Sequence, residues 1–323
     1  MRKYVFGVAL AIACTIPASA EEVCKLKRYA VIPFEADETA HIYVPATIAG
    51  RSTRLMLDTG AYWSLIREDL AKSLNLKIKR STDMYLIDLA GKKIDQIATV
   101  PVVKIGPVAF SGEVDFFIGG DTPGHTIDQE GGIFGLNLLT QMDLEIDNAG
   151  KTISLFSQDH CQGDGVHWAT EAVTLKYKRQ QADRPIGTRL KQKIDKNQID
   201  SPIVVADLEG EPLSVLFDTG ATYSALDLGV AKARFGIGPG SPGVEFTGKT
   251  YTGSGEALDT YKYTFKSLTI AGIHFENIPI RLVQFDNSSQ MLIGMNEMKH
   301  LRLYFSFKEG LIHITAADAG RSQ

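Results

Sequence analysis

The stretch Asp58-Thr59-Gly60-Ala61 recurs in the second half of the chain as Asp218-Thr219-Gly220-Ala221. The two aspartates are 160 positions apart (218 − 58 = 160), about half of the 323 residues. A single Asp-Thr-Gly occurs often by chance, but two copies in matching surroundings are a stronger signal. The repeat predicts one carboxylate per half at equivalent positions.

The likeness continues on both sides of this stretch. Gly50 is matched by Gly210, and Ile133-Phe134-Gly135 is matched by Leu292-Ile293-Gly294, because 294 − 135 = 159. Each copy reads as a strand, a glycine turn and an apolar strand that runs into the Asp. We expect two tandem units, over 27–157 and 173–317, joined by a linker over 158–172.

Short β-branched and aromatic runs, broken by Gly, Pro and Asp, dominate both units. Helical signal is confined to short pieces, expected over 66–76, 136–142, 225–234 and 295–301. Many short strands with few helices predict an all-β fold with barrel-like units.

Composition excludes some classes of function. With 44% hydrophobic and 22% charged residues and a net charge of −4, the chain is an ordinary globular protein without the basic footprint of a nucleic-acid binder. We expect no cofactor and no metal. His160, Cys161 and His167 lie in the linker, but their spacing fits no known metal site, so they are expected to be solvated.

The N-terminus has the pattern of a secretory signal peptide over 1–20. Arg2 and Lys3 precede an apolar run, and a small-residue site ends at Ala20, which predicts cleavage there and a periplasmic or secreted protein. Two alternatives are an uncleaved anchor and lipoprotein processing at Cys14. No other stretch is apolar enough to span a membrane.

Cleavage would leave two cysteines, Cys24 and Cys161. An even number in an exported protein predicts one disulfide between them. Two free thiols remain the alternative, because the sequence does not give their separation.

Two facing carboxylates can share one proton, because like charges in a buried site repel. The ionised partner can activate a water and the protonated one can hydrogen-bond a carbonyl, which is general acid–base hydrolysis. Gly60 and Gly220 allow close approach beneath the carboxylates. Thr59 and Thr219 bring hydroxyls that could bridge the halves. The alternative is two Asx-type turns at strand ends.

These motifs together resemble the aspartic protease clan, and are closer to its retropepsin-like branch than to the pepsins. Ala61 and Ala221 stand where pepsins usually carry Ser. The resemblance implies that Gly135 and Gly294 pack behind the catalytic loops, and that the fused units form an internal pseudo-dimer about a pseudo-two-fold axis. The Arg that often follows the later Gly in viral members is replaced by Leu136 and Met295.

The resemblance also implies β-hairpin flaps over the cleft. The candidates are 86–94, turning at Gly91, and 247–257, turning at Gly253, with Tyr85 and Tyr251 as possible substrate contacts. Ordinary hairpins with half-buried tyrosines are the alternative.

Three functions are compatible with these patterns. The first is a monomeric exported endopeptidase with Asp58 and Asp218 as its dyad, acting on a peptide or protein substrate. The second is a homodimer in which each unit pairs with its own copy. The third is a peptide-binding protein of the same fold without activity.

Overall fold

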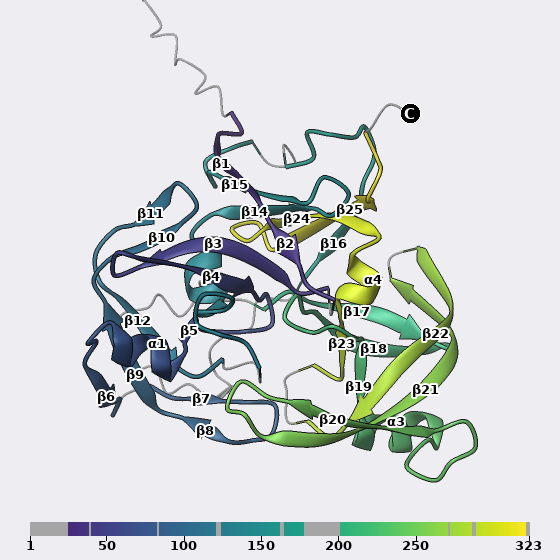
Figure 1. Ribbon diagram of the computed structural model, residues 1–323. Helices are drawn as coiled ribbons and strands as arrows, with labels where there is room; N and C mark the ends of the chain where they lie inside the picture. The colour runs from purple at the N-terminus through teal and green to yellow at the C-terminus, as the bar shows by residue number, and fades with distance from the viewer. Residues whose placement is uncertain are drawn as a thin grey trace, which may run out of the picture.

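The computed structural model describes residues 25–38, 40–82, 84–120, 124–161, 165–177, 201–270, 272–285 and 289–320. The predicted signal peptide, with Cys14 and Ala20, and the predicted disulfide partner Cys24 lie outside these residues. Within them the chain forms many strands and four short helices (Figure 1). The predicted all-β fold of two barrel-like units is confirmed.

The first half builds a ten-stranded, barrel-like sheet with the order β11-β10-β3-β4-β13-β5-β12-β9-β6, and β2 pairs with β3. The strands are β2 (Glu35–Ala36), β3 (Ile42–Ile48), β4 (Arg51–Leu57), β5 (Leu65–Ile66), β6 (Ile78–Arg80), β9 (Gln96–Val100), β10 (Val103–Ile105), β11 (Val108–Phe110), β12 (Val114–Ile118) and β13 (Gly132–Phe134).

The second half builds a seven-stranded sheet with the order β17-β18-β23-β19-β22-β21-β20, and β17 also pairs with β21. This additional pairing closes the sheet into a barrel. The strands are β17 (Ile203–Leu208), β18 (Glu211–Phe217), β19 (Ala225–Asp227), β20 (Glu245–Tyr251), β21 (Ala257–Ile270), β22 (Ile273–Val283) and β23 (Met291–Ile293).

A third sheet joins the halves. Its order is β1-β15-β14-β24-β25-β16, and β14 of the first half pairs antiparallel with β24 of the second, with Leu144 opposite Phe305. In Figure 1 this shared sheet lies at the top of the molecule, and the hairpin of β7 (Leu86–Ile87) and β8 (Lys93–Ile94) lies at the bottom. The strands are β1 (Arg28–Pro33), β14 (Asp143–Asp147), β15 (Thr152–Phe156), β16 (Val173–Lys176), β24 (Leu301–Ser306) and β25 (Leu311–Ala316).

The glycine turns predicted before each Asp have the same geometry in both halves. Ala49 and Gly50 have φ of 48° and 88°, and Glu209 and Gly210 have φ of 51° and 88°. Two consecutive residues with positive φ fit a two-residue type I′ hairpin turn, which favours glycine at the second position. The turn fixes the register of the hairpin and therefore the place where the following strand delivers its Asp.

The helices are shorter than predicted: α1 (Glu68–Ser73), α2 (Leu136–Leu139), α3 (Leu228–Phe235) and α4 (Met295–Met298). The start expected at Ala225 is wrong, because Ala225–Asp227 forms β19 between β22 and β23. Helix α3 then begins where the Asp227 carboxylate accepts a hydrogen bond from the Val230 N–H at 3.0 Å. The residues before this cap pair with neighbouring strands instead of extending the helix.

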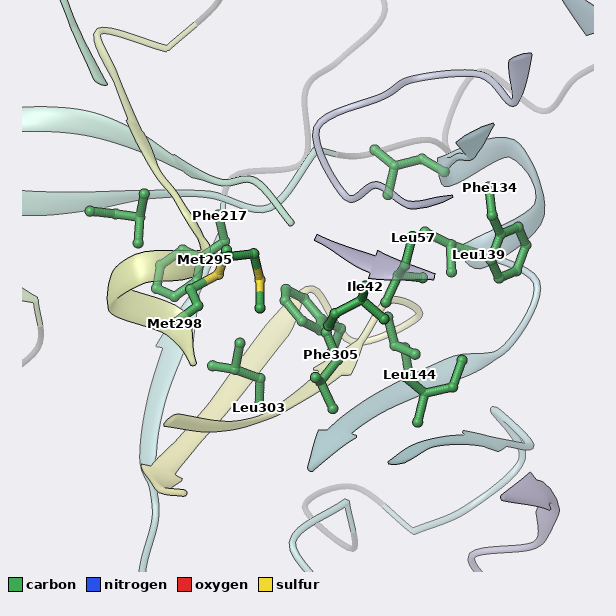
Figure 2. Packing of buried hydrophobic residues seen from close by; sticks show 14 of the residues in the cluster. Ile42, Leu57, Phe134, Leu139, Leu144, Phe217, Met295, Met298, Leu303 and Phe305 are labelled. Atoms are coloured by element: carbon green, nitrogen blue, oxygen red, sulfur yellow. The ribbon is translucent and has the colours of Figure 1, made fainter. Parts of the chain in front are cut away.

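A single apolar core runs from one half into the other. Leu57 and Phe217, the residues directly before the two aspartates, are both fully buried. Figure 2 shows them in one cluster with Leu144 and Phe305 of the shared sheet. Burial of these side chains holds the ends of β4 and β18 in place, and with them the loops that follow.

The prediction that the linker histidines are solvated is wrong for His160. Its side chain is 2% exposed, and Nε2 lies 2.8 Å from the buried Asp143 carboxylate of β14. His167 is partly buried, with Nε2 2.9 Å from Glu145. Both histidines therefore fasten the linker to the shared sheet. The Cys24–Cys161 disulfide and the predicted unit boundaries stay predictions.

Candidate active site

The two Asp-Thr-Gly-Ala loops meet between the halves through their threonines. The Thr59 N–H donates to Thr219 Oγ1 at 3.0 Å, and the Thr219 N–H donates to Thr59 Oγ1 at 3.1 Å. Each hydroxyl then donates to a backbone carbonyl of the other half, Thr59 to Phe217 at 2.6 Å and Thr219 to Leu57 at 2.8 Å. Both threonines are fully buried. The four bonds fix the loops against each other in a two-fold arrangement.

Each carboxyl group lies against the glycine of the opposite loop. A Cβ on Gly60 would be 2.5 Å from Asp218 Cγ, and a Cβ on Gly220 would be 2.4 Å from Asp58 Cγ. These separations are far below van der Waals contact, so only glycine allows the approach. Asp58 is 9% exposed and Asp218 is 8% exposed. The structure thus brings the two predicted aspartates together in one nearly buried pair.

The hydrogen bonds to the two carboxyl groups differ. Asp58 Oδ1 accepts from the backbone N–H groups of Gly60 and Ala61, both at 2.8 Å. Asp218 Oδ1 accepts from the Gly220 N–H at 2.9 Å, whereas the Ala221 N–H donates to the backbone carbonyl of Asp218. Backbone donors stabilise a carboxylate over a carboxylic acid. The negative charge is therefore better supported on Asp58.

Burial raises the pKa of Asp58, and the N–H groups of Ala61 and Gly60 act in the opposite direction. Burial raises the pKa of Asp218 well above its usual range, and the neighbouring charge of Asp58 raises it further. A pair of this kind keeps one proton where isolated carboxylates would have none. The two carboxyl groups therefore titrate as a pair that shares this proton.

Gly135 and Gly294 pack behind these loops. A Cβ on Gly135 would lie 2.8 Å from the backbone of Trp63, and one on Gly294 would lie 2.6 Å from the backbone of Tyr223. The residues after these glycines also bond the loops: the Leu136 N–H donates to the Ala61 carbonyl at 2.9 Å, and the Met295 N–H to the Ala221 carbonyl at 2.8 Å.

A serine supports each loop from within its own half, but its partners differ. The Ser64 hydroxyl accepts from the Gly135 N–H at 3.0 Å and donates to Asn137 Oδ1 at 2.7 Å. The Ser224 hydroxyl accepts from the Gly294 N–H at 3.1 Å and donates to Glu297 Oε2 at 2.5 Å. Burial raises the pKa of Glu297. One half thus uses a neutral amide where the other uses a titratable carboxyl group.

Both predicted hairpins are present, and their role as flaps over the cleft stays a prediction. Strands β7 (Leu86–Ile87) and β8 (Lys93–Ile94) form the first, with Gly91 at its turn (φ 76°), and β20 and β21 form the second around Gly253. The ring of Tyr85 lies beneath Lys93 Nζ, 5.1 Å away, and Tyr251 is exposed. Contact of either tyrosine with substrate stays a prediction.

The two flaps bind each other, which the sequence did not predict. The Asp88 carboxylate of the first flap accepts from the Thr252 hydroxyl at 2.5 Å and also from the Ser254 hydroxyl. Lys92 pairs with Glu256 at 2.5 Å. We call these contacts the flap latch. In Figure 1, β7 and β8 accordingly lie beside β20.

His41 is a further residue that the sequence did not single out. Its Nε2 lies 3.1 Å from Thr222 Oγ1 in the opposite catalytic loop, and Nδ1 lies 3.7 Å from Asp37. A positive charge on His41 favours the ionised form of Asp58. No motif marks this position, because the counterpart of His41 in the second half is a serine, Ser201 (41 + 160 = 201).

Comparisons with known proteins agree with this geometry. Residues 44–141 match a family model described as "gag-polyprotein putative aspartyl protease", and residues 204–296 match a second model described as "aspartyl protease". Each match contains one Asp-Thr-Gly-Ala loop and its later glycine. The search of curated proteins found no match.

Among solved structures, the crystal structure of the aspartic proteinase from Irpex lacteus is similar, with 10% identity and a TM-score of 0.46 over 91% of this chain and 98% of that one. No helix in the described part of the chain is both long and apolar enough to cross a bilayer.

Both halves match aspartyl protease models, and each supplies one carboxyl group to a shared pair. The chain is therefore a retropepsin-like aspartic protease.

Proposed function

We propose that the chain is an exported endopeptidase in which Asp58 and Asp218 hydrolyse peptide bonds as one general acid–base pair. The observation that carries this proposal is the pair itself: two nearly buried carboxyl groups, each seated on the glycine of the opposite loop, with both pKa values raised. Such a pair holds a single proton over a range of pH, which is the state that the reaction requires.

The two aspartates have different roles in the first step. Asp58, whose charge is supported by two N–H groups, takes a proton from a water bound between the carboxyls. The water oxygen bonds to the scissile carbonyl carbon while the carbonyl oxygen receives the proton of Asp218. The tetrahedral intermediate then breaks its C–N bond as the proton now on Asp58 goes to the departing amine nitrogen, while Asp218 takes back a proton from a hydroxyl of the intermediate, which becomes the new carboxyl group and restores the pair. No covalent bond to the enzyme forms.

Asparagine substitutions test the pair. Asp58→Asn and Asp218→Asn are each expected to abolish hydrolysis of a soluble peptide, and the double variant is expected to lose no more than either single one, because the residues act as a unit. Circular dichroism supplies the folding control. If Asp218→Asn kept most of the activity, pairs of Asp58 in a homodimer would replace the dyad within one chain.

The pH dependence gives a second measurement. Both carboxyl pKa values are raised, so the singly protonated pair persists to higher pH than for ordinary carboxyls. The rate should fall when that proton is lost at high pH and when a second is gained at low pH, which gives a bell-shaped kcat/KM profile centred on the acid side of neutral. Activity that rose steadily into alkaline pH would overturn the mechanism.

Two further parts of the proposal concern assembly and location. Molecular mass in solution distinguishes the monomer, in which Asp58 faces Asp218, from a homodimer with self-paired units.

Export rests on the sequence over 1–20, and N-terminal sequencing of the mature protein should find Glu21 first. A peptide-binding protein without activity would bind peptides in every variant and cleave none.

A further inference from the structure

Two smaller apolar clusters include residues of the flap hairpins, and each is built mainly from one half. We call them the first and second flap-side clusters, because each includes flap residues: Leu86 and Ile94 in the first, Leu89 and Leu258 in the second. The first contains Tyr43, Met56, Trp63, Leu65, Ile94, Ile97, Phe117 and Ile133, and the second contains Ile203, Leu216, Ala225, Val283, Phe285 and Leu292.

The second cluster lacks counterparts of Trp63 and Phe117. The position equivalent to Trp63 is Tyr223 (63 + 160 = 223). The position equivalent to Phe117 follows from two matching contacts. The Phe117 N–H donates to the Ser64 carbonyl at 3.1 Å, and the Arg281 N–H donates to the Ser224 carbonyl at 2.8 Å. Arg281 thus stands in the second half where Phe117 stands in the first.

Strand pairing leads to the same assignment. Phe117 lies opposite Leu65 in the β12–β5 ladder, and Arg281 lies opposite Ala225 in the β22–β19 ladder, where 65 + 160 = 225. The ring contacts are also equivalent. Trp63 and Phe117 pack edge to face with centroids 6.1 Å apart, while the Arg281 guanidinium carbon lies 4.2 Å above the Tyr223 ring. A cation–π pair replaces an aromatic pair.

Arg281 has no carboxylate partner among the described residues. Its Nη1 is buried and makes no hydrogen bond. The residue opposite Arg281 on β21 is Lys262, another cation, and Lys262 pairs with Glu245 at 2.8 Å. A buried guanidinium N–H without an acceptor is costly. Stacking on Tyr223 occupies one face of the guanidinium, so an acceptor would have to meet its N–H groups in the plane of the group.

The Tyr223–Arg281 pair lies beside the catalytic loop. Tyr223 is five residues after Asp218 and is 48% exposed. Val283, two residues beyond Arg281 on the same strand, belongs to the second flap-side cluster and lies opposite Thr260 of the second flap's strand β21. A peptide held under the flaps would therefore meet a cation in the second half and only apolar rings at the equivalent place in the first.

We propose that Arg281, stacked on Tyr223, binds the carboxylate of an acidic side chain of the peptide substrate and so determines specificity on one side of the scissile bond. A planar guanidinium can donate two parallel hydrogen bonds to a carboxylate. The substrate class is a peptide with an apolar side chain toward Trp63 and Phe117 and a Glu or Asp toward Arg281. The preference in cleavage rests on the proposed endopeptidase function, whereas the binding of the acidic side chain by Arg281 does not.

Paired peptides test it. Peptides that differ only by Glu or Gln at each position around the cleaved bond should give a kcat/KM ratio of roughly ten- to a hundredfold at one position. The ratio should fall to near one in Arg281→Met, and Arg281→Glu should prefer Lys there. Arg281→Lys should keep part of the preference. Lys262→Met is the matched control and should leave the ratio unchanged. Thermal melts verify folding.

Binding separates this inference from the proposed function. In the Asp218→Asn background, fluorescence anisotropy should show tighter binding of the Glu peptide, and Arg281→Met should remove the difference. If no peptide is cleaved but this discrimination is found, the endopeptidase proposal fails and the role of Arg281 stands. A wild-type Glu/Gln ratio near one at every position, or a ratio that survives Arg281→Met, would overturn the role of Arg281.

Discussion

The two halves of this protease agree closely around the carboxyl pair and diverge one layer away from it. The reciprocal threonine bonds and the glycine contacts are matched between the loops. Behind them, Asn137 in one half is replaced by Glu297 in the other. Beside them, an aromatic pair is replaced by Tyr223 and Arg281. The reaction centre needs symmetry, whereas its surroundings are free to differ.

Substitutions in the matched catalytic loops are expected to lower activity the most. Gly60→Ala and Gly220→Ala should each lower kcat/KM by on the order of a hundredfold or more, because the added Cβ would displace the opposite carboxyl group. Gly238→Ala is the control, since a Cβ there meets no atom within 4 Å. If steady-state kinetics of the three variants showed that only one of the two loop glycines is essential, the two catalytic loops would not be equivalent.

The flap latch is an unequal contact between the halves, because one flap supplies the carboxylate and the other supplies the hydroxyls. Asp88→Ala should raise KM roughly three- to tenfold with a smaller change in kcat, since the closed form loses two charge-assisted hydrogen bonds between the flaps. The first flap's turn also loses the bonds from the Ala90 and Lys92 N–H groups to Asp88 Oδ1. Lys92→Met removes only an exposed ion pair and should change KM less than about twofold. Equal effects of the two variants would argue against a specific latch.

The smallest effect concerns Glu297. Burial raises the pKa of Glu297, so the folded protein holds this proton more tightly than the unfolded chain does. The resulting stabilisation is present at acid pH and is lost as pH rises from the ordinary value of 4.5 through the raised value. In the Glu297→Gln variant, this part of the pH dependence of the unfolding free energy should disappear.

Denaturant unfolding at several pH values measures the difference between Glu297→Gln and the wild type. Asn137→Ala is the matched variant in the first half. It should cost about 1–2 kcal/mol at every pH, because the Asn137 amide does not titrate. A wild-type minus Glu297→Gln difference that stayed constant with pH would show that the carboxyl group does not titrate in this range.

The repeat made the centre of the site predictable from sequence. Asp58 and Asp218 could be paired because the spacing of 160 recurs from Gly50 to Ser64, and glycines mark the places where chain segments approach most closely. The all-β fold followed from strand-like runs. The later start of α3 could not be predicted, because Ala225 pairs with distant strands that outweigh its local helical preference.

The sequence motifs could not predict contacts between segments that are far apart in the chain. His160 has a hydrophilic side chain in a glycine-containing segment, and only the fold shows that it meets Asp143. Asp88, His41 and Arg281 each act through a partner more than 50 residues away or in the other half. Their residue types are ordinary for loops and strand edges, so no local pattern distinguishes them.

The reciprocal threonine bonds have a consequence for the time before the protein is fully folded. Each loop needs the backbone carbonyl and the hydroxyl of the other to satisfy its own buried groups. A chain in which only the first half has folded holds one carboxyl group and no partner to raise its pKa by charge. The carboxyl pair therefore forms only when both halves have folded and their loops have met, so the proposed hydrolysis should appear late in folding.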